Sequence, residues 1–210
     1  MIKVCVVDDH PVAREGLKRI IGEHSEMAVT GETGDGHEAL NLIKSGHFDV
    51  VLLDIAMPTK NGLDVLKELR AESPLLPVLI LTMHAEEQYA VRVLRAGAAG
   101  YLTKAAAPAQ LVQAIRKVFR GGKYVSPELA ERLAFDLDGA SARPTHEILS
   151  DREYQVLCMI ASGDTVTEIA TKLCLSAKTI STYRVRLLEK LNMKHNAELA
   201  RYAIKQGLVD

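Results

Sequence analysis

A run of four aliphatic residues, Val50–Leu53, leads directly into Asp54, and Pro58 follows four residues later. An uninterrupted apolar run of this length is typical of a strand that is covered on both faces, as in a parallel sheet. Open α/β sheets bind their ligands beyond the carboxyl ends of the strands. The run therefore predicts a buried parallel strand that presents Asp54 at the ligand-binding edge, although an Asp in this position could also simply begin a turn.

Four other segments repeat this arrangement of a strand followed by a helix. We expect the other strands at Ile2–Val7, Met27–Thr33, 78–81 and 98–103. Helical patterns follow at Pro11–Gly22, Gly36–Ser45, about 63–71, a segment ending at Gly97, and about 108–120. This alternation predicts an α/β fold with a five-stranded doubly wound parallel sheet. Because the second strand alone ends without a candidate functional residue, we predict the flavodoxin-like order 2-1-3-4-5, with the reactive edge between strands 1 and 3.

Polar residues at the ends of four strands form the candidate site. They are Asp8, Asp9, Asp54, Thr82 and Lys104. Three carboxylates against one ammonium leave a surplus of about two negative charges, which is costly in a partly desolvated pocket. A divalent cation removes this repulsion, and oxygen ligands with room for water and phosphate suit Mg²⁺. We therefore predict Mg²⁺ held by Asp9 and Asp54, with Asp8 in support.

The same residues could carry out phosphoryl transfer. With one oxygen of Asp54 on the cation, the other can attack a phosphoryl group and form an acyl phosphate. Such transfer depends mainly on positioning and charge neutralisation, which Lys104 would provide, while the Thr82 hydroxyl would hydrogen-bond a phosphoryl oxygen. Each residue alone also has an ordinary explanation as a helix cap, a packed side chain or a surface charge. Their joint placement along one edge indicates a phosphoacceptor site.

This set of residues resembles a known family. The receiver domain of two-component response regulators is similar in the following residues: Asp8-Asp9, Asp54 with Met57-Pro58 and Gly62, Thr82, Tyr101 and Lys104. Two further motifs resemble the NarL/FixJ group of this family: Asp-Asp-His-Pro with Arg14-Glu-Gly-Leu, and Gly97-Ala-Ala-Gly-Tyr-Leu-Thr-Lys. The resemblance covers about residues 1–122. It implies phosphorylation of Asp54 by the phosphohistidine of a sensor histidine kinase, Mg²⁺ ligation by Asp9, Asp54 and the backbone carbonyl of Ala56, and a joint shift of Thr82 and Tyr101 on phosphorylation.

Gly121-Gly122 ends the first predicted domain. Ser126-Pro127-Glu128 predicts the start of a helix that runs to about Asp136, and residues 138–144 have the composition of a linker. We predict a receiver domain at 1–122, a helix and linker at 123–145, and a further domain at 146–210. Residues 148–210 hold nine Lys and Arg against seven Asp and Glu, whereas residues 1–125 hold fifteen of each. The basic surplus weakly indicates that the C-terminal domain meets a polyanion.

The C-terminal domain has the pattern of a helix-turn-helix. Ser150 and Glu153 predict a capping box at the start of one helix, which Gly163 ends. A short helix at 166–173, a three-residue turn and a helix at 177–191 follow. Two helices joined by such a turn are typical of a helix-turn-helix, although any small helical bundle contains similar turns.

The residues of this domain resemble the LuxR-type DNA-binding domain over about 146–210. The matching motifs are Leu149-Ser-x-Arg152-Glu153, Ile160-Ala-x-Gly163, Glu168-Ile-Ala, Leu175-Ser-x-Lys178-Thr179-Ile180, Lys190-Leu191 and Gly207-Leu-Val. The resemblance implies that 177–191 enters the major groove of double-stranded DNA at a promoter operator, and that 196–206 supports a homodimer. Many members have Lys at the position of Ser181 and a basic residue at that of Val185.

At about 100° per residue, one face of the 177–191 helix is expected to point outward. The candidate DNA contacts are Lys178, Thr179, Ser181, Thr182, Val185 and Arg186, together with Arg184, which lies over the apolar face and can reach outward only along it.

The three cysteines, Cys5, Cys158 and Cys174, are far apart in apolar contexts, so we expect buried free thiols and neither a disulfide nor a metal site. The longest apolar runs are far below 18 residues, and a strand begins at Ile2. We therefore expect a cytoplasmic protein without a membrane span or a secretory leader.

Together these features predict a response regulator that a sensor kinase phosphorylates on Asp54 and that then binds DNA as a dimer to regulate transcription. It would be no conventional enzyme, but a phosphoacceptor that catalyses its own phosphotransfer and dephosphorylation. One alternative is an aspartyl-phosphate hydrolase, but the haloacid-dehalogenase type needs a second Asp where this chain has Ala56. Another is a receiver that acts through protein contacts without phosphate, against which the complete acidic set argues.

Overall fold

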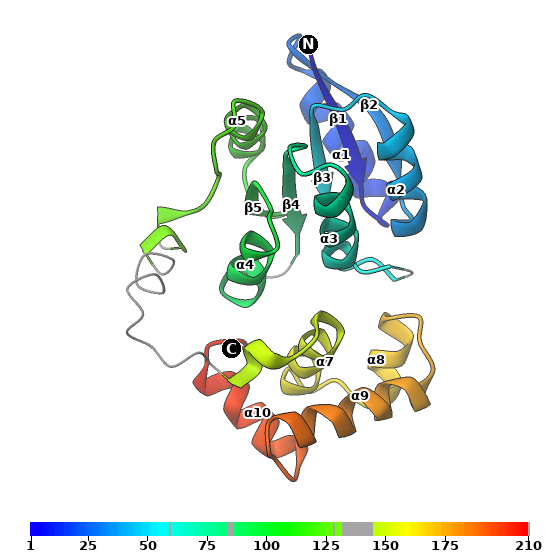
Figure 1. The fold of residues 1–210 in the computed structure, drawn as a ribbon, viewed down its shortest axis with the longest axis vertical. Coiled ribbons are helices and arrows are strands. Elements are labelled where there is room, and N and C mark those ends of the chain that lie inside the picture. The colour runs from blue at the N-terminus through cyan, green and yellow to red at the C-terminus, as the bar shows by residue number, and fades with distance from the viewer. Residues whose placement is uncertain (59, 84–85, 128, 132–144, 210) are drawn as a thin grey trace. The chain divides into compact units, whose positions relative to one another are not determined.

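The computed structural model describes residues 1–210 except 59, 84–85, 128, 132–144 and 210. The chain divides into two compact units, Met1–Arg132 and Leu133–Asp210 (Figure 1).

The first unit contains a five-stranded parallel sheet in the order β2-β1-β3-β4-β5, which confirms the predicted fold and strand order. Its strands are β1 (Ile2–Val7), β2 (Met27–Thr33), β3 (Val50–Leu53), β4 (Val78–Thr82) and β5 (Gly100–Thr103). Its helices are α1 (Pro11–Gly22), α2 (Gly36–Ser45), α3 (Gly62–Glu72), α4 (Glu86–Arg95) and α5 (Pro108–Phe119).

Helices cover the sheet on both faces, which explains the uninterrupted apolar runs. Residues of α1 and α5 pack against one face in a single core cluster, while α2, α3 and α4 lie on the other face (Figure 1). Every residue of β3 is buried, as its sequence predicted. Cys5 in β1 is also fully buried, and burial raises the pKa of its thiol to about 12. This thiol is therefore unreactive at neutral pH.

The fifth strand begins at Gly100, two residues later than predicted. The reason lies in the end of α4, where Gly97 has a φ of +102°. The amide of Gly97 donates to the Leu94 carbonyl, and the amide of Ala98 donates to the Val93 carbonyl. These two hydrogen bonds form a Schellman motif, so Ala98 belongs to the helix terminus, and the Ala99 amide is the first to bond to β4, through the Val78 carbonyl.

The predicted helix after Gly122 is described only at its start. The Ser126 hydroxyl accepts a hydrogen bond from the Leu129 amide at 3.0 Å, which confirms Ser126 as the cap. The rest of this helix, to about Asp136, and the linker at 138–144 lie outside the described residues.

The second unit is helical. Its described elements are the 3₁₀ helix η1 (Thr145–Ile148) and the helices α7 (Asp151–Ala161), α8 (Val166–Lys172), α9 (Ala177–Lys190) and α10 (Asn196–Lys205). The predicted capping box at the start of α7 is present: the Ser150 hydroxyl accepts from the Glu153 amide, and the Glu153 carboxylate accepts from the Ser150 amide at 2.8 Å. Gly163, with a φ of +95°, follows the end of α7 as predicted.

An ion pair between the buried Glu153 and the exposed Lys190 links α7 and α9. The Glu153 side chain is only 3% exposed, and its Oε2 lies 2.7 Å from Nζ of Lys190. Burial by itself raises the pKa of Glu153, but hydrogen bonds from Lys190 and Ser150 more than compensate, so its pKa lies below its ordinary value. This pair helps to hold the C-terminal end of α9 against the start of α7.

The turn between α8 and α9 corrects one prediction. Cys5 and Cys158 are buried as expected, but Cys174 is exposed. Its φ is +51°, and the amides of Cys174 and Leu175 donate to the carbonyls of Thr171 and Ala170. Cys174 thus occupies the left-handed position of a Schellman motif, usually a glycine position, and its side chain is left outside the core.

Candidate functional site

Four side chains converge beyond the carboxyl ends of β1 and β3. One ligand atom from each of Asp8, Asp9, His10 and Asp54 lies within 4.8 Å of the others. The two strands are neighbours in the sheet, and the Asp54 amide donates to the Val7 carbonyl at 2.9 Å. This pairing brings the two strand ends together, as the predicted strand order required.

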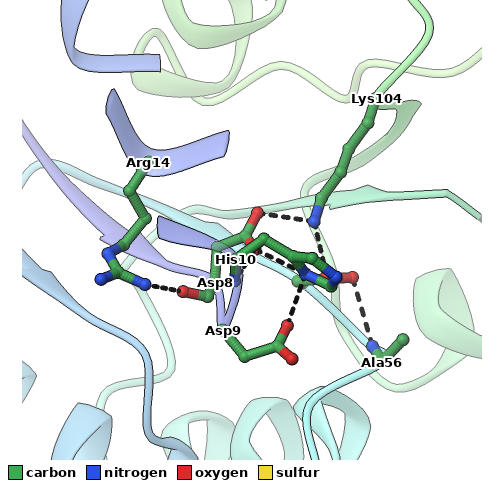
Figure 2. Close-up of polar contacts among 7 residues, drawn as sticks. Asp8, Asp9, His10, Arg14, Ala56 and Lys104 are labelled. Atoms are coloured by element: carbon green, nitrogen blue, oxygen red, sulfur yellow. Dashed lines mark hydrogen bonds and ion pairs between the residues drawn. The ribbon is translucent and has the colours of Figure 1, made fainter. Parts of the chain in front are cut away.

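Lys104 joins the acidic residues from the end of β5. Its Nζ lies 2.6 Å from Oδ2 of Asp8 (Figure 2) and 2.7 Å from Oδ2 of Asp54. Both carboxylates are only 2% exposed. Burial by itself lowers the pKa of Lys104, but hydrogen bonds to Asp54 and Asp8 more than compensate, so its pKa lies above its ordinary value. Lys104 therefore remains a cation at neutral pH.

The loop after β3 shapes the surroundings of Asp54. The Ala56 amide donates to Oδ1 of Asp54 at 3.2 Å. Gly62, the first residue of α3, donates its amide to the Ile55 carbonyl at 3.0 Å and packs against the Asp54 backbone. A Cβ on Gly62 would lie 1.9 Å from the Asp54 carbonyl oxygen, so this close return of the chain requires glycine.

The cluster is typical of divalent-metal binding. Its donors are mainly carboxylate oxygens, which Mg²⁺ prefers. Oδ1 of Asp9 is buried and receives no hydrogen bond. The Nδ1 atom of His10 lies 2.8 Å from this oxygen, at ion-pair distance but without a hydrogen bond, and the His10 side chain is 62% exposed (Figure 2). A buried carboxylate oxygen without a donor fits a site that a cation completes.

Two residues that hydrogen-bond to Asp8 were not among the predicted site residues. His10 is part of the cluster, and its amide also donates to Oδ1 of Asp8 at 2.9 Å. Arg14 of α1 donates from Nη1 to the Asp8 carbonyl at 2.6 Å (Figure 2). His10 directly follows the acidic pair, so its position was a usable signal. Nothing in the spacing from Asp8 to Arg14 indicated that the side chain turns back onto the end of β1.

Thr82 and Tyr101 lie on the two strands next to the cluster. Thr82 ends β4 and Tyr101 lies within β5, where it pairs with Ile80. Both side chains are buried. The Thr82 carbonyl accepts from the Lys104 amide at 2.8 Å, which links the end of β4 to the lysine of the cluster.

The second unit presents the predicted outward face of α9. Five of the predicted DNA-contacting residues are exposed: Lys178, Ser181, Thr182, Val185 and Arg186. Thr179 is half-buried, and its hydroxyl lies 2.8 Å from that of Ser176, the cap of α9. Arg184 is also half-buried, and its Nε donates to Oδ1 of Asn196 at 2.6 Å. The helix is therefore rotated as the sequence predicted, with Arg184 turned toward α10.

Comparison with known proteins gives the same division of the chain. The family model of the response regulator receiver domain matches residues 4–116, and that of bacterial regulatory proteins of the luxR family matches residues 147–203. The chain belongs to the NarL/FixJ group of two-component response regulators.

Relatives of this response regulator match it along its whole length. The response regulator GacA of Pseudomonas aeruginosa is 41% identical over 211 residues, which cover 100% of this chain and 99% of the relative. The response regulator UvrY of Escherichia coli strain K12 is 37% identical over 209 residues, which cover 99% and 96% of the two chains.

Solved response regulators also share its architecture. The response regulator ChrA of a heme-sensing two-component system has a TM-score of 0.54 and 32% identity, covering 99% of this chain and 98% of the other. RcsB of Salmonella enterica serovar Typhimurium, bound to the promoter P1flhDC in the presence of the phosphomimetic BeF₃⁻, has a TM-score of 0.64 and 27% identity, covering 96% and 97%. As for membrane association, the described helices of this response regulator all lack the length and apolar character needed to span a bilayer.

Proposed function

We propose that this response regulator controls transcription in the cytoplasm and is switched on by phosphorylation of Asp54. The donor is the phosphohistidine of a sensor histidine kinase. One observation carries the proposal: the Lys104 ammonium bridges Asp8 and Asp54, while the buried Oδ1 of Asp9 receives no hydrogen bond. The pocket thus combines a cation for a phosphoryl oxygen with a carboxylate that a metal ion would complete.

The residues of the pocket have distinct roles in phosphoryl transfer. Asp9, Asp54 and the Ala56 carbonyl would hold Mg²⁺, with Asp8 in support, and the bound ion neutralises charge on the phosphoryl group. An oxygen of Asp54 attacks phosphorus and forms an acyl phosphate, while the P–N bond of the phosphohistidine breaks and its electron pair returns to the imidazole nitrogen. Lys104 moves from the Asp54 carboxylate to a phosphoryl oxygen. The chain thereby catalyses its own phosphorylation and, with water as the later nucleophile, its own dephosphorylation.

Thr82 and Tyr101 transmit the effect of Asp54 phosphorylation to the conformation of the unit. The Thr82 hydroxyl hydrogen-bonds a phosphoryl oxygen, and Thr82 and Tyr101 move together toward the active conformation. Phosphorylation shifts the population only if the two conformations differ in their affinity for the phosphoryl group, which the Thr82 hydrogen bond provides. The active state is a homodimer.

The second unit reads promoter DNA in this proposal. Helix α9 lies in the major groove of an operator, and α10 supports the dimer. The contacts come from the exposed residues Lys178, Ser181, Thr182, Val185 and Arg186, with Thr179 at the start of the helix. The DNA-bound RcsB structures obtained with a phosphomimetic support the same link between phosphorylation and DNA binding.

Phosphorylation should increase both dimer formation and DNA affinity of the full chain. We expect sedimentation velocity to show a shift from monomer toward dimer after incubation with Mg²⁺ and acetyl phosphate. Binding to an operator selected from a randomised library should tighten under the same conditions. If Asp54 became fully phosphorylated while both the monomer and its operator affinity stayed unchanged, the proposed switch would be wrong.

Three basic residues of α9 should have three different mutant phenotypes. Arg186→Ala should cost about 1–3 kcal/mol of binding and relax preference at one base position, because an exposed Arg can contact a guanine edge through two hydrogen bonds. Lys178→Ala should weaken binding to all DNA sequences alike. It should also reduce the slope of log affinity against log salt concentration by about one, as the loss of a phosphate contact does. Arg184→Ala should instead lower thermal stability, because the Arg184 side chain is hydrogen-bonded to Asn196.

These three variants can be compared on one randomised operator library at two salt concentrations. A change in base preference caused by Arg184→Ala alone would contradict the observed rotation of α9.

A further inference from the structure

Val185 is an exposed aliphatic residue on the outward face of α9. Its side chain is 49% exposed. Single exposed valines need no explanation on most surfaces, but this one lies at a special position. With Ile180 on the buried side set at 0°, the exposed residues Ser181 to Arg186 fall between about 100° and 240°, and Val185 falls at about 140°. It therefore lies on the central part of the face that enters the groove in the proposed function.

Val185 is the large hydrophobic side chain that α9 exposes on this face, among polar and charged neighbours. Arg184 is directed away, since its Nε is bonded to Asn196 of α10. The Thr182 hydroxyl donates to the Lys178 carbonyl at 3.0 Å, so this hydroxyl proton already has an acceptor within the helix and is not directed at DNA. Arg186 lies about 100° around the helix from Val185. Two branched methyl groups, without any hydrogen-bonding atom, thus face outward between groups that can contact phosphates or polar base edges.

We infer that Val185 reads a thymine by contact with its C5-methyl group in the major groove, an inference that rests on the proposed DNA-binding function. Among the four bases, thymine alone presents a methyl group at this edge. Contact between two apolar groups removes both from water and is favourable. A purine would place its N7 acceptor against the valine and leave it without a partner, which costs free energy, whereas cytosine would present only a C5–H and lose the methyl contact. Val185 therefore determines specificity without forming a hydrogen bond.

Replacement of thymine by deoxyuridine tests this contact, because it removes the methyl group and keeps the pairing. The full chain, treated with Mg²⁺ and acetyl phosphate, first selects an operator from a randomised library. Each thymine of that duplex is then replaced singly, and affinity is measured by fluorescence anisotropy. We expect one position in each half-site at which the replacement weakens binding about fourfold, as expected for one methyl-sized group returned to water.

Variants of Val185 identify the residue that makes the contact. Val185→Ala should bind the thymine and deoxyuridine duplexes equally, whereas Val185→Thr, which keeps one methyl group, should retain part of the difference. Val185→Arg should select guanine at the same position. Ile148→Ala removes an aliphatic side chain that is 58% exposed in η1, outside α9, and should leave the fourfold difference intact. Circular dichroism should show unchanged folding, since alanine favours a helix more than valine does.

The outcomes separate this inference from the proposed function. If the wild-type chain selected no sequence at all, the proposed DNA-binding function would fail and the inference with it. If it selected an operator but tolerated deoxyuridine at every position, Val185 would read no methyl group. A deoxyuridine effect that persisted in Val185→Ala would assign the contact to another residue and overturn the inference.

Discussion

Asp54→Asn should take up no phosphoryl group from acetyl phosphate in the presence of Mg²⁺, whereas the wild-type chain should approach one group per molecule. The amide that replaces the carboxylate is a poor nucleophile and removes one anionic ligand from the cluster. Intact-mass spectrometry measures the uptake directly. The modification of the wild-type chain should survive acid and be lost in base, as expected of an acyl phosphate.

Two further variants make this result specific. Asp64→Asn introduces the same chemical change at an exposed position in the first turn of α3 and should leave uptake unchanged. Lys104→Ala should separate uptake from output, because the phosphorylated carboxylate would lack the ammonium that now bridges Asp8 and Asp54. Phosphorylation of this variant should therefore no longer increase its DNA affinity. Stoichiometric label on Asp54→Asn would show that another residue accepts the phosphoryl group.

The sequence predicted the architecture of the first unit because strand burial and strand ends are local features. Both the strand order and the edge where Asp8, Asp54 and Lys104 meet could be predicted from the buried run Val50–Leu53 and from the polar residues at the ends of β1, β3, β4 and β5. A parallel sheet aligns the carboxyl ends of its strands, so residues more than 40 positions apart in sequence could be placed together.

The contacts that the sequence did not predict depend on where long side chains turn. Arg14 returns to the Asp8 carbonyl, and Lys190 reaches Glu153 across 37 residues. Cys174 was expected in the core because its neighbours are apolar, but its left-handed backbone places it outside. Sequence periodicity gives the direction in which a side chain leaves a helix, but not the distant partner that fixes its end.

Gly62→Ala should strongly destabilise the first unit and lower the rate of Asp54 phosphorylation. The added Cβ would lie 1.9 Å from the Asp54 carbonyl oxygen and 2.9 Å from the Ile55 Cα. These are backbone atoms of the residues that form the site, so no side chain can move aside to relieve the clash. The loop must shift, and we expect a loss of about 3 kcal/mol in the free energy of unfolding. The shift also moves Asp54 relative to Asp8, Asp9 and Lys104.

Gly16→Ala provides the matched control, because it adds the same methyl group at an interior position of α1 where nothing lies within 4 Å. Alanine favours a helix over glycine, so this variant should gain about 0.5–1 kcal/mol of stability. Calorimetry of the full chain measures both changes as shifts of the melting temperature in opposite directions. Initial rates of phosphorylation with Mg²⁺ and acetyl phosphate should fall for Gly62→Ala and stay unchanged for Gly16→Ala. Wild-type stability and rate in Gly62→Ala would mean that the return of the chain past Asp54 is looser than the structure shows, and that its glycine is not required to position the phosphoacceptor.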